Sequence, residues 1–205
     1  MGKVLQNLEM YIQQVLEEQN SIPENRKPVL QDLKAYISNN IKPGQNLNLN
    51  FICTHNSRRS QLSQAWAQTA AFYYGLPNVA CYSGGVEVTA FNERAVIAIQ
   101  DAGFKIVKKE KKDNPIYFVY FSEEEFLTMY SKLFDDPINA HKNFAAIMTC
   151  AEADENCPFI PGADARIPLR YNDPKEFDGT PLEAEKYKER CFEIAVEMFY
   201  VFSKI

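Results

Sequence analysis

The fold of this chain is decided by the stretch Cys53-Thr54-His55-Asn56-Ser57-Arg58-Arg59-Ser60. An alternating polar and apolar run at 47–52 precedes it and predicts a short strand, and residues 61–74 follow it with apolar positions at helical spacing. The stretch is therefore a predicted turn from a strand into a helix. Such a turn directs backbone N–H groups and the positive end of a helix dipole at one point, which suits a tetrahedral oxyanion.

The side chains of the stretch have separate candidate roles. Cys53 is the candidate nucleophile, because the field that attracts an oxyanion also favours thiolate over thiol. Arg59 presents a planar fork of donors that can pair two oxygens of phosphate or arsenate, and Ser60 can hydrogen-bond the thiolate. Asn56 tolerates a left-handed backbone at the bend. The expected oxyanion-binding residues are Thr54, His55, Asn56, Ser57, Arg58 and Arg59.

The alternative is a buried cysteine at a strand end with a solvated arginine nearby, but strand, turn and helix occur in the order that the site requires. The pattern Cys-x5-Arg-Ser, with Asn at the third step, resembles the low-molecular-weight tyrosine phosphatases and their relatives, the thioredoxin-coupled arsenate reductases. These eight residues select the superfamily and do not select the reaction.

Composition narrows the class of protein. The chain has 205 residues, of which 46% are apolar and 24% charged, so it can build a full core. Its net charge of −5 argues against non-specific nucleic-acid binding. No apolar run approaches the about 20 residues of a membrane helix, and we expect a cytoplasmic protein without a membrane partner. Five cysteines in a reducing compartment favour catalytic or redox thiols over structural disulfides.

Periodicity divides the chain into an extension and a domain. Apolar faces at 5–16 and 29–41 predict two amphipathic helices, so we assign residues 1–44 to an N-terminal helical extension and 45–205 to the catalytic domain. The extension either packs onto the domain or serves dimerisation or docking. Strands at 78–83 and 144–149 and helices at 92–102 and 182–203 complete the alternating pattern.

The expected fold class is α/β, a three-layer open parallel sheet. The resemblance implies a low-molecular-weight phosphatase-like domain with flavodoxin-like strand order. Residues 104–121 predict a β-hairpin inserted at a sheet edge, with a charged turn that contains the lysines near 110. The acidic stretch 122–142 is expected to be irregular, with one short helix at 124–133.

A second informative stretch starts at Cys150 and ends at Cys157-Pro158, and Asp173-Pro174 follows it. Two cysteines at this distance do not suit a zinc site, which needs closer pairs and further ligands, although they could be unrelated core residues. The stretch resembles the arsenate reductases, in which Cys-x6-Cys-Pro follows the third strand and Asp-Pro the fourth. That resemblance implies that Cys150 and Cys157 are resolving thiols, that Asp173 is the general acid, and that a thioredoxin-like protein is the reductant.

The chain departs from the family pattern at three positions. His55 replaces a glycine, Arg58 replaces a residue that is usually cysteine, and Gln64 replaces a glutamate that in some members helps to hold a potassium ion. We expect no metal or organic cofactor, and a potassium ion stays an open expectation.

Three functions fit these residues. The favoured one is reduction of arsenate to arsenite through Cys53, Cys150 and Cys157. The close alternative is hydrolysis of phosphate monoesters through a phosphocysteine, which shares the first loop and has no use for the other two thiols. The third is a non-enzymatic oxyanion or redox sensor whose N-terminal helices bind a partner.

Overall fold

The computed structural model describes residues 2–109, 112–156, 159–203 and 205. Four parallel strands form the main sheet in the order β2-β1-β6-β7. They are β1 (Leu47–Cys53), β2 (Val79–Gly85), β6 (Phe144–Met148) and β7 (Ala163–Ile167). This order confirms the predicted open, flavodoxin-like sheet, whose strands end where an α/β protein binds its ligands.

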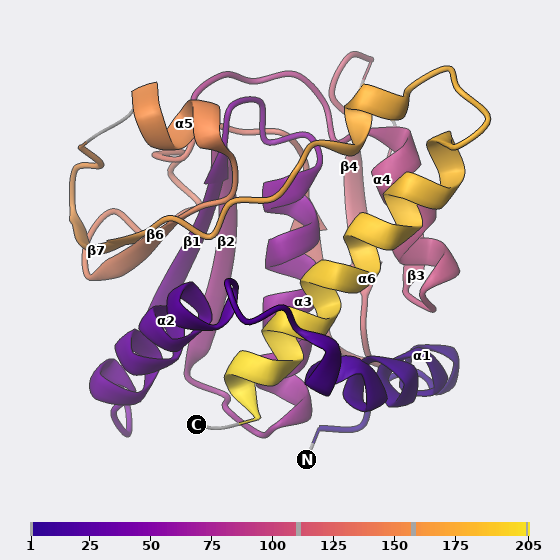
Figure 1. Cartoon of the computed structure of the whole chain (residues 1–205). Helices are drawn as coiled ribbons and strands as arrows, with labels where there is room; N and C mark the ends of the chain where they lie inside the picture. The colour runs from indigo at the N-terminus through magenta and orange to yellow at the C-terminus, as the bar shows by residue number, and fades with distance from the viewer. Residues whose placement is uncertain (1, 110–111, 157–158, 204) are drawn as a thin grey trace.

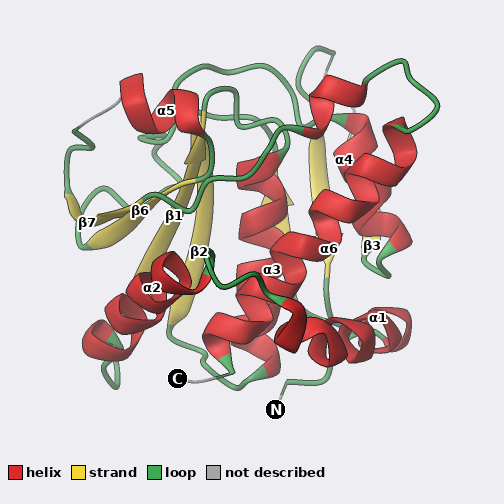
Figure 2. Cartoon of the chain, viewed as in Figure 1, coloured by secondary structure: helices red, strands yellow, loops and turns green. Residues whose placement is uncertain are grey.

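The α-helices are α1 (Gln6–Glu17), α2 (Lys27–Asn40), α3 (Arg59–Tyr73), α4 (Glu93–Asp101), α5 (Ala151–Asn156) and α6 (Glu183–Phe202). Two short 3-10 helices, η1 (Glu18–Ser21) and η2 (Pro174–Phe177), lie in the connections. Figure 1 shows α6 crossing α3, with α1 and α2 near the two chain ends and α5 at the opposite end of the sheet. Figure 2 separates the strands of the sheet from these helices.

The two faces of the sheet are covered differently. Alternate residues of β1, Leu49 and Phe51, belong to the large core that the helices cover. Ile52 points to the other face, where it shares a small apolar cluster with Phe144 and Phe134. The third layer of the predicted architecture is therefore built from irregular chain around Phe134 and from α5, and Cys53 at the end of β1 packs in the cluster between this layer and the sheet.

The inserted hairpin is confirmed, but its predicted place at an edge of the main sheet and the short helix predicted after it are wrong. β3 (Lys105–Lys109) and β4 (Ile116–Tyr120) pair with a third strand, β5 (Phe126–Met129), in a separate antiparallel sheet rather than at an edge of the main sheet. β5 replaces the short helix expected at 124–133. Its side chains pack across the strand pair, with the ring centroids of Tyr120 and Phe126 4.9 Å apart, and such cross-strand contacts override a weak helical pattern.

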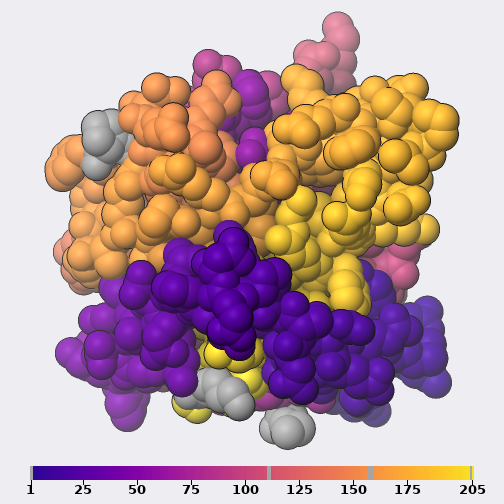
Figure 3. All heavy atoms as spheres, viewed as in Figure 1, coloured from indigo at the N-terminus to yellow at the C-terminus, as the bar shows by residue number. Residues whose placement is uncertain are grey.

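The two N-terminal helices lie against α6. Leu8 and Ile12 of α1 and Leu30 and Leu33 of α2 are fully buried in the same core as the helical face of the sheet. In Figure 3 the N-terminal residues and the C-terminal helix form one continuous surface. Within the described ranges, no helix combines the length and the apolar character that crossing a membrane requires.

Candidate active site

The loop between β1 and α3 is held by its own side chains. Asn56 has a φ of 46°, the left-handed conformation predicted for the bend. Its Nδ2 donates to Ser60 Oγ at 2.9 Å, and its Oδ1 accepts from the backbone N–H of Lys132 at 3.0 Å. Gln61 Nε2 donates to the Asn56 carbonyl at 3.0 Å. A residue in a disfavoured conformation is thus fixed by three neighbours, so the loop is preorganised.

Gly85 allows β2 to approach this loop closely. A Cβ at this position would lie 2.7 Å from the backbone nitrogen of Asn56, closer than real Cβ atoms come to other atoms. The turn after β2 therefore packs against the first loop at Gly85. Gly84 has a different neighbour, the backbone of Phe134.

Cys53 and Ser60 make the predicted contact. Cys53 Sγ lies 3.0 Å from Ser60 Oγ, and both residues are buried. Ser60 already accepts a hydrogen bond from Asn56, so its hydroxyl proton is available to the sulfur. A thiolate at this position would keep one donor after it is withdrawn from water.

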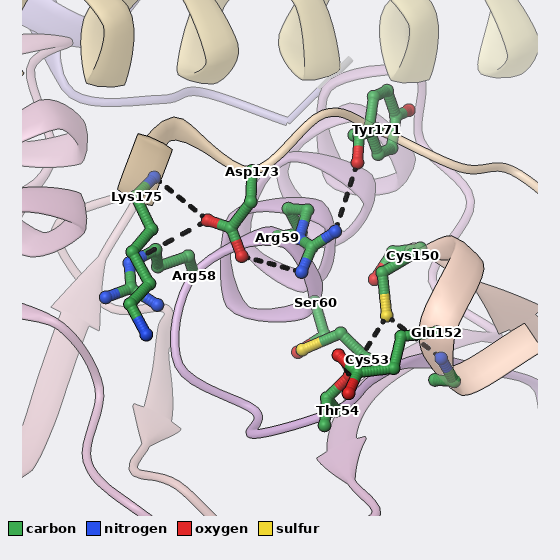
Figure 4. A network of polar contacts seen from close by, with 12 residues as sticks. Cys53, Thr54, Arg58, Arg59, Ser60, Cys150, Glu152, Tyr171, Asp173 and Lys175 are labelled. Carbon is green, nitrogen blue, oxygen red and sulfur yellow. Dashed lines mark hydrogen bonds and ion pairs between the residues drawn. The ribbon is translucent and has the colours of Figure 1, made fainter. Parts of the chain in front are cut away.

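Arg59 is bound on two sides by the segment that follows β7. One terminal nitrogen donates to Asp173 Oδ2 at 2.6 Å and the other to the backbone carbonyl of Tyr171 at 3.2 Å. Figure 4 shows Arg59 between these two partners. Asp173 also accepts from the backbone N–H of Lys175 at 3.1 Å. The predicted general acid and the predicted oxyanion-binding arginine are thus in direct contact.

Arg58 makes its hydrogen bond to a different residue from those that bind Arg59. Its Nε donates to the hydroxyl of Tyr187 at 2.8 Å, and the same atom is 3.9 Å from Asp173 Oδ1. A terminal nitrogen is 3.7 Å from Asp178 Oδ2. The two adjacent arginines therefore share Asp173, and the hydrogen bond of Arg58 is made to Tyr187 in the first turns of α6.

Cys150 lies against the loop. Its Sγ is 3.5 Å from the hydroxyl of Thr54 and accepts from the backbone N–H of Ala153 at 3.4 Å. The Thr54 hydroxyl donates to Glu152 Oε2 at 2.9 Å. Cys53 and Cys150 also share the small apolar cluster on this face of the sheet, and the two sulfur atoms lie on the same side of the site in Figure 4.

Cys157, the third predicted thiol, lies outside the described residues. The residues between the two cysteines form α5. Cys53, Cys81, Cys150 and Cys191 are free thiols.

The remaining loop side chains do not converge on Cys53. Ser57 Oγ donates to the carbonyl of Ala90 at 2.7 Å, and His55 Nε2 lies 3.5 Å from Glu87 Oε2 in a half-exposed position. Only the backbone of these residues is left to face an oxyanion. Their side chains tie the loop to the chain that follows β2.

A cleft of about 580 Å³ adjoins the loop on the side of Ser57 and Arg58 rather than directly over Cys53. The inserted sheet and the start of α4 form its walls. Its charged lining residues are Arg58, Glu93, Arg94, Lys108, Lys112, Asp113 and Lys175. Five of these seven are cationic, so the mouth of the site favours anions.

Gln64 was expected at the place where some relatives hold a potassium ion. Its Oε1 accepts from Ser83 at 2.7 Å and its Nε2 donates to the Cys81 carbonyl at 3.0 Å, so both polar atoms have protein partners. Among the described residues no group of three or more His, Cys, Asp or Glu side chains could hold a metal ion.

Sequence reasoning missed two contributors. Tyr171 binds Arg59 through its backbone carbonyl, which no side-chain pattern reveals, although the residue stands two before Asp173. Glu152 accepts a hydrogen bond from the Thr54 hydroxyl. Its position two residues after Cys150 could have indicated that it lies near the site.

No protein-family model matches the sequence. The arsenate reductase of Bacillus licheniformis is 30% identical over 141 residues, which cover 68% of this chain and 83% of that protein. The arsenate reductase of Staphylococcus aureus strain Newman is 28% identical over 150 residues, 73% of this chain and 92% of that protein. A low-molecular-weight phosphotyrosine phosphatase from Vibrio cholerae O395 has the same fold, with a TM-score of 0.51 at 14% identity over 78% of this chain and 96% of that one.

Proposed function

We propose that this chain reduces arsenate to arsenite. It belongs to the superfamily of the thioredoxin-coupled arsenate reductases and low-molecular-weight tyrosine phosphatases, and it is an enzyme of that superfamily. The observation that carries the proposal is the position of Cys150. Its sulfur lies 3.5 Å from the side chain of Thr54, the neighbour of Cys53 in the chain. Hydrolysis of a phosphate ester has no use for a second thiol at this place.

The first step is formation of an arsenic–sulfur bond. The Cys53 thiolate attacks the arsenic atom of hydrogen arsenate, and the departing hydroxyl group takes a proton from Asp173 and leaves as water. The backbone N–H groups of the loop and the guanidinium of Arg59 hold the remaining oxygens. Arg59 Nε supports this role, because it is buried and has no hydrogen-bond partner among the described residues.

The second step transfers two electrons to arsenic. The Cys150 thiolate attacks Cys53 Sγ, the arsenic–sulfur bond breaks, and arsenite leaves with the bonding pair. Cys157 then attacks Cys150, which frees Cys53 and produces a Cys150–Cys157 disulfide. A thioredoxin-like dithiol reduces that disulfide and closes the cycle. We assign no step to a potassium ion, because the neutral amide of Gln64 is used by Ser83 and Cys81.

One observation favours phosphate monoester hydrolysis as the second candidate. The basic cleft beside the loop, about 580 Å³, is far larger than arsenate requires and could receive the organic part of a phosphate ester. In that reaction Cys53 forms a phosphocysteine, Asp173 protonates the leaving alkoxide, and water hydrolyses the intermediate.

Two assays on the purified protein test the proposal. Arsenate is supplied with thioredoxin, thioredoxin reductase and NADPH, and an aryl phosphate is supplied separately. We expect arsenate turnover that Cys53→Ser, Cys150→Ser and Cys157→Ser each abolish. Aryl phosphate hydrolysis, where present, should disappear only in Cys53→Ser. Cys81→Ala is the control, because Cys81 lies on β2 and burial raises the pKa of its thiol.

A reductant-free experiment separates the two reactions. Stoichiometric arsenate should yield one Cys150–Cys157 disulfide per chain, detected by peptide mass mapping. Brisk aryl phosphate hydrolysis without that disulfide would establish the phosphatase instead. Binding of arsenate without turnover of either substrate would leave the sensor.

A further inference from the structure

The N-terminal extension reaches the active site through one arginine. Arg26 stands immediately before α2, and its Nε and one terminal nitrogen donate to the two carboxylate oxygens of Glu197 at 2.7 and 2.8 Å. Its other terminal nitrogen donates to the backbone carbonyl of Arg170 at 2.9 Å. The guanidinium lies 5.0 Å from the ring centroid of Tyr171. A bidentate arginine of this kind fixes position as well as charge.

Glu197 connects this arginine to Tyr171. It lies on α6 and is only 2% exposed, and its second carboxylate oxygen also accepts from the hydroxyl of Tyr171 at 2.7 Å. Burial raises the pKa of Tyr171 well above its ordinary value, so the phenol stays protonated and remains a donor. Arg26, Glu197 and Tyr171 thus form one hydrogen-bonded unit between the extension, α6 and the chain after β7.

The same segment holds the active-site arginine on its other side. The backbone carbonyl of Tyr171 accepts from Arg59, and Asp173 pairs with Arg59 two residues later. Residues 168–173 lie outside the strands and helices, so no ladder of backbone hydrogen bonds fixes them. The backbone N–H of Tyr171 donates to the Thr149 carbonyl, and two further backbone bonds join Leu169 to Ile167 and Glu176 to Asp173. The other contacts that fix this segment, as the structure describes them, are made by side chains.

We propose that Arg26 and Glu197 are positioning residues that hold residues 170–173 in register with the oxyanion loop. The proposal rests on the proposed function, since it assigns Arg59 and Asp173 to the reaction. It gives the N-terminal extension a part in catalysis without contact with substrate. We call the contacts that join Arg26, Glu197 and Tyr171 the clamp. A shift of about 1 Å in a catalytic group can lower the rate by up to about 10²-fold, so loss of the clamp should reduce the rate measurably.

The test compares Arg26→Met with a packing variant of α2, Leu30→Ala, whose side chain is fully buried in the apolar core and forms none of the polar contacts of Arg26. Both variants should lower the midpoint of thermal unfolding. Below that midpoint, Arg26→Met should reduce kcat/KM about tenfold for whichever substrate the wild type turns over, and Leu30→Ala should stay within about twofold. Tyr171→Phe removes one hydroxyl and keeps the backbone carbonyl, so it should fold and lose about threefold.

A double-variant cycle distinguishes positioning from general destabilisation. If Arg26 acts partly through Asp173, the tenfold effect of Arg26→Met should shrink below about threefold in an Asp173→Asn background. An undiminished tenfold effect, or kcat/KM for Arg26→Met within twofold of the wild type, would overturn the proposal.

Binding of inorganic phosphate, measured by calorimetry, keeps this test separate from the proposed function. If the wild type turns over neither substrate, the proposed function fails while positioning is still measurable. Arg26→Met should then weaken phosphate binding about tenfold and Leu30→Ala should not. Equal affinity in both variants would reject the clamp.

Discussion

Two adjacent arginines in the oxyanion loop share Asp173 and differ in their other contacts. Arg59 donates to Asp173 at 2.6 Å and to the Tyr171 carbonyl, whereas Arg58 donates to Tyr187 of α6 and is 3.9 Å from Asp173. Only Arg59 has the spacing from Cys53 that the loop requires. The guanidinium fork cannot be replaced by an ammonium, which offers no planar pair of donors.

Substitution of each arginine should therefore have a different result. Arg59→Lys should lower kcat/KM about 10²-fold, the usual cost of removing one donor from a charge-stabilising site. Arg58→Ala should lose less than about threefold in kcat/KM and should mainly lower the unfolding midpoint, because it breaks contacts with α6. Steady-state assays and thermal melts of both variants measure the two effects. The reverse ranking of the two rates would contradict the assigned loop geometry.

Lys132 is an ionisable residue that the reaction does not use. It is buried beside the loop, and burial lowers the pKa of its ammonium to about 8. The unfolded chain, with a lysine pKa of about 10.4, therefore binds more protons than the folded chain between pH 8 and 10.4. The stability of the wild type should rise across that interval and should not change through Lys132 below it.

Lys132→Met should accordingly stabilise the protein most at pH 7. The gain in unfolding free energy should shrink by up to about 1.4 kcal/mol per pH unit above pH 8. The loop itself is spared, because Asn56 is held by the backbone N–H of Lys132 and not by its side chain. Urea denaturation of wild type and variant at pH 7 and 9.5 measures the difference, with the exposed Lys142→Met as control. If the difference in unfolding free energy between the two proteins did not change with pH, the pKa of Lys132 would not be lowered in the folded chain.

The contacts of the first loop follow from local sequence, and the contacts of the clamp do not. Asn56, Ser60 and Cys53 lie within eight consecutive residues, so strand, turn and helix geometry alone brings them together. Arg26 and Glu197 are separated by 171 positions, and their pairing depends on how α2 packs against α6. A lone arginine between two amphipathic helices carries no local signal of a buried partner.

At the scale of elements, α5 occupies the six positions between the two predicted resolving thiols. A helix continued over positions 150 and 157, with a rise of about 1.5 Å per residue, would separate them by roughly 10 Å, whereas a disulfide requires Cα atoms within about 7 Å. We therefore expect that formation of the disulfide unwinds α5. Asp154 opposes this, because its side chain is only 3% exposed and pairs with Arg166 at 2.5 Å and with Arg170 Nε at 2.6 Å.

Loss of this anchor should make the disulfide form faster. Asp154→Asn removes the charge that ties α5 to β7 and to the chain beyond it, so the oxidised pair should form roughly tenfold faster, a change of about 1.4 kcal/mol in the opening step. Quenched-flow alkylation after addition of arsenate or diamide measures the rate. Glu155→Gln is the matched control, because it removes a carboxylate from the exposed face of the same helix and breaks only a 3.5 Å pair with Arg170. An unchanged rate in Asp154→Asn would mean that opening of α5 is not limiting.

The regular elements were readable from periodicity where the pattern was long. The helices α1, α2, α3 and α6 and the apolar strand β6 were predicted to within a few residues. The helix predicted at 124–133 was wrong because four strand residues are too few to separate a repeat of two from a repeat of 3.6. Pairing with β4 makes this segment a strand. The third layer was equally hidden, since the irregular chain around Phe134 has no periodicity.

At the scale of the whole molecule, the N-terminal helices and the catalytic domain share one core. Leu33 of α2 and Leu8 of α1 belong to the same buried cluster as Phe51 of β1, which leads directly to Cys53. Tyr11 of α1 stacks on Trp66 of α3 with ring centroids 5.5 Å apart. Since the chain has one tryptophan, its emission reports on the junction between the extension and the helix that carries Arg59.

Unfolding of the extension should therefore coincide with loss of the active site. In a urea titration, the emission of Trp66, the far-UV circular dichroism and the enzymatic activity should share one midpoint, as a single cooperative unit requires. Leu33→Ala should lower all three midpoints together, because removal of a fully buried leucine side chain leaves a cavity. The corresponding loss in unfolding free energy should be about 2–5 kcal/mol. The exposed Met10→Ala on α1 is the control and should shift none of them by more than about 0.5 kcal/mol. If the emission of Trp66 changed at lower urea while activity persisted, the extension would be an independent unit, and its contact with the catalytic domain would be dispensable.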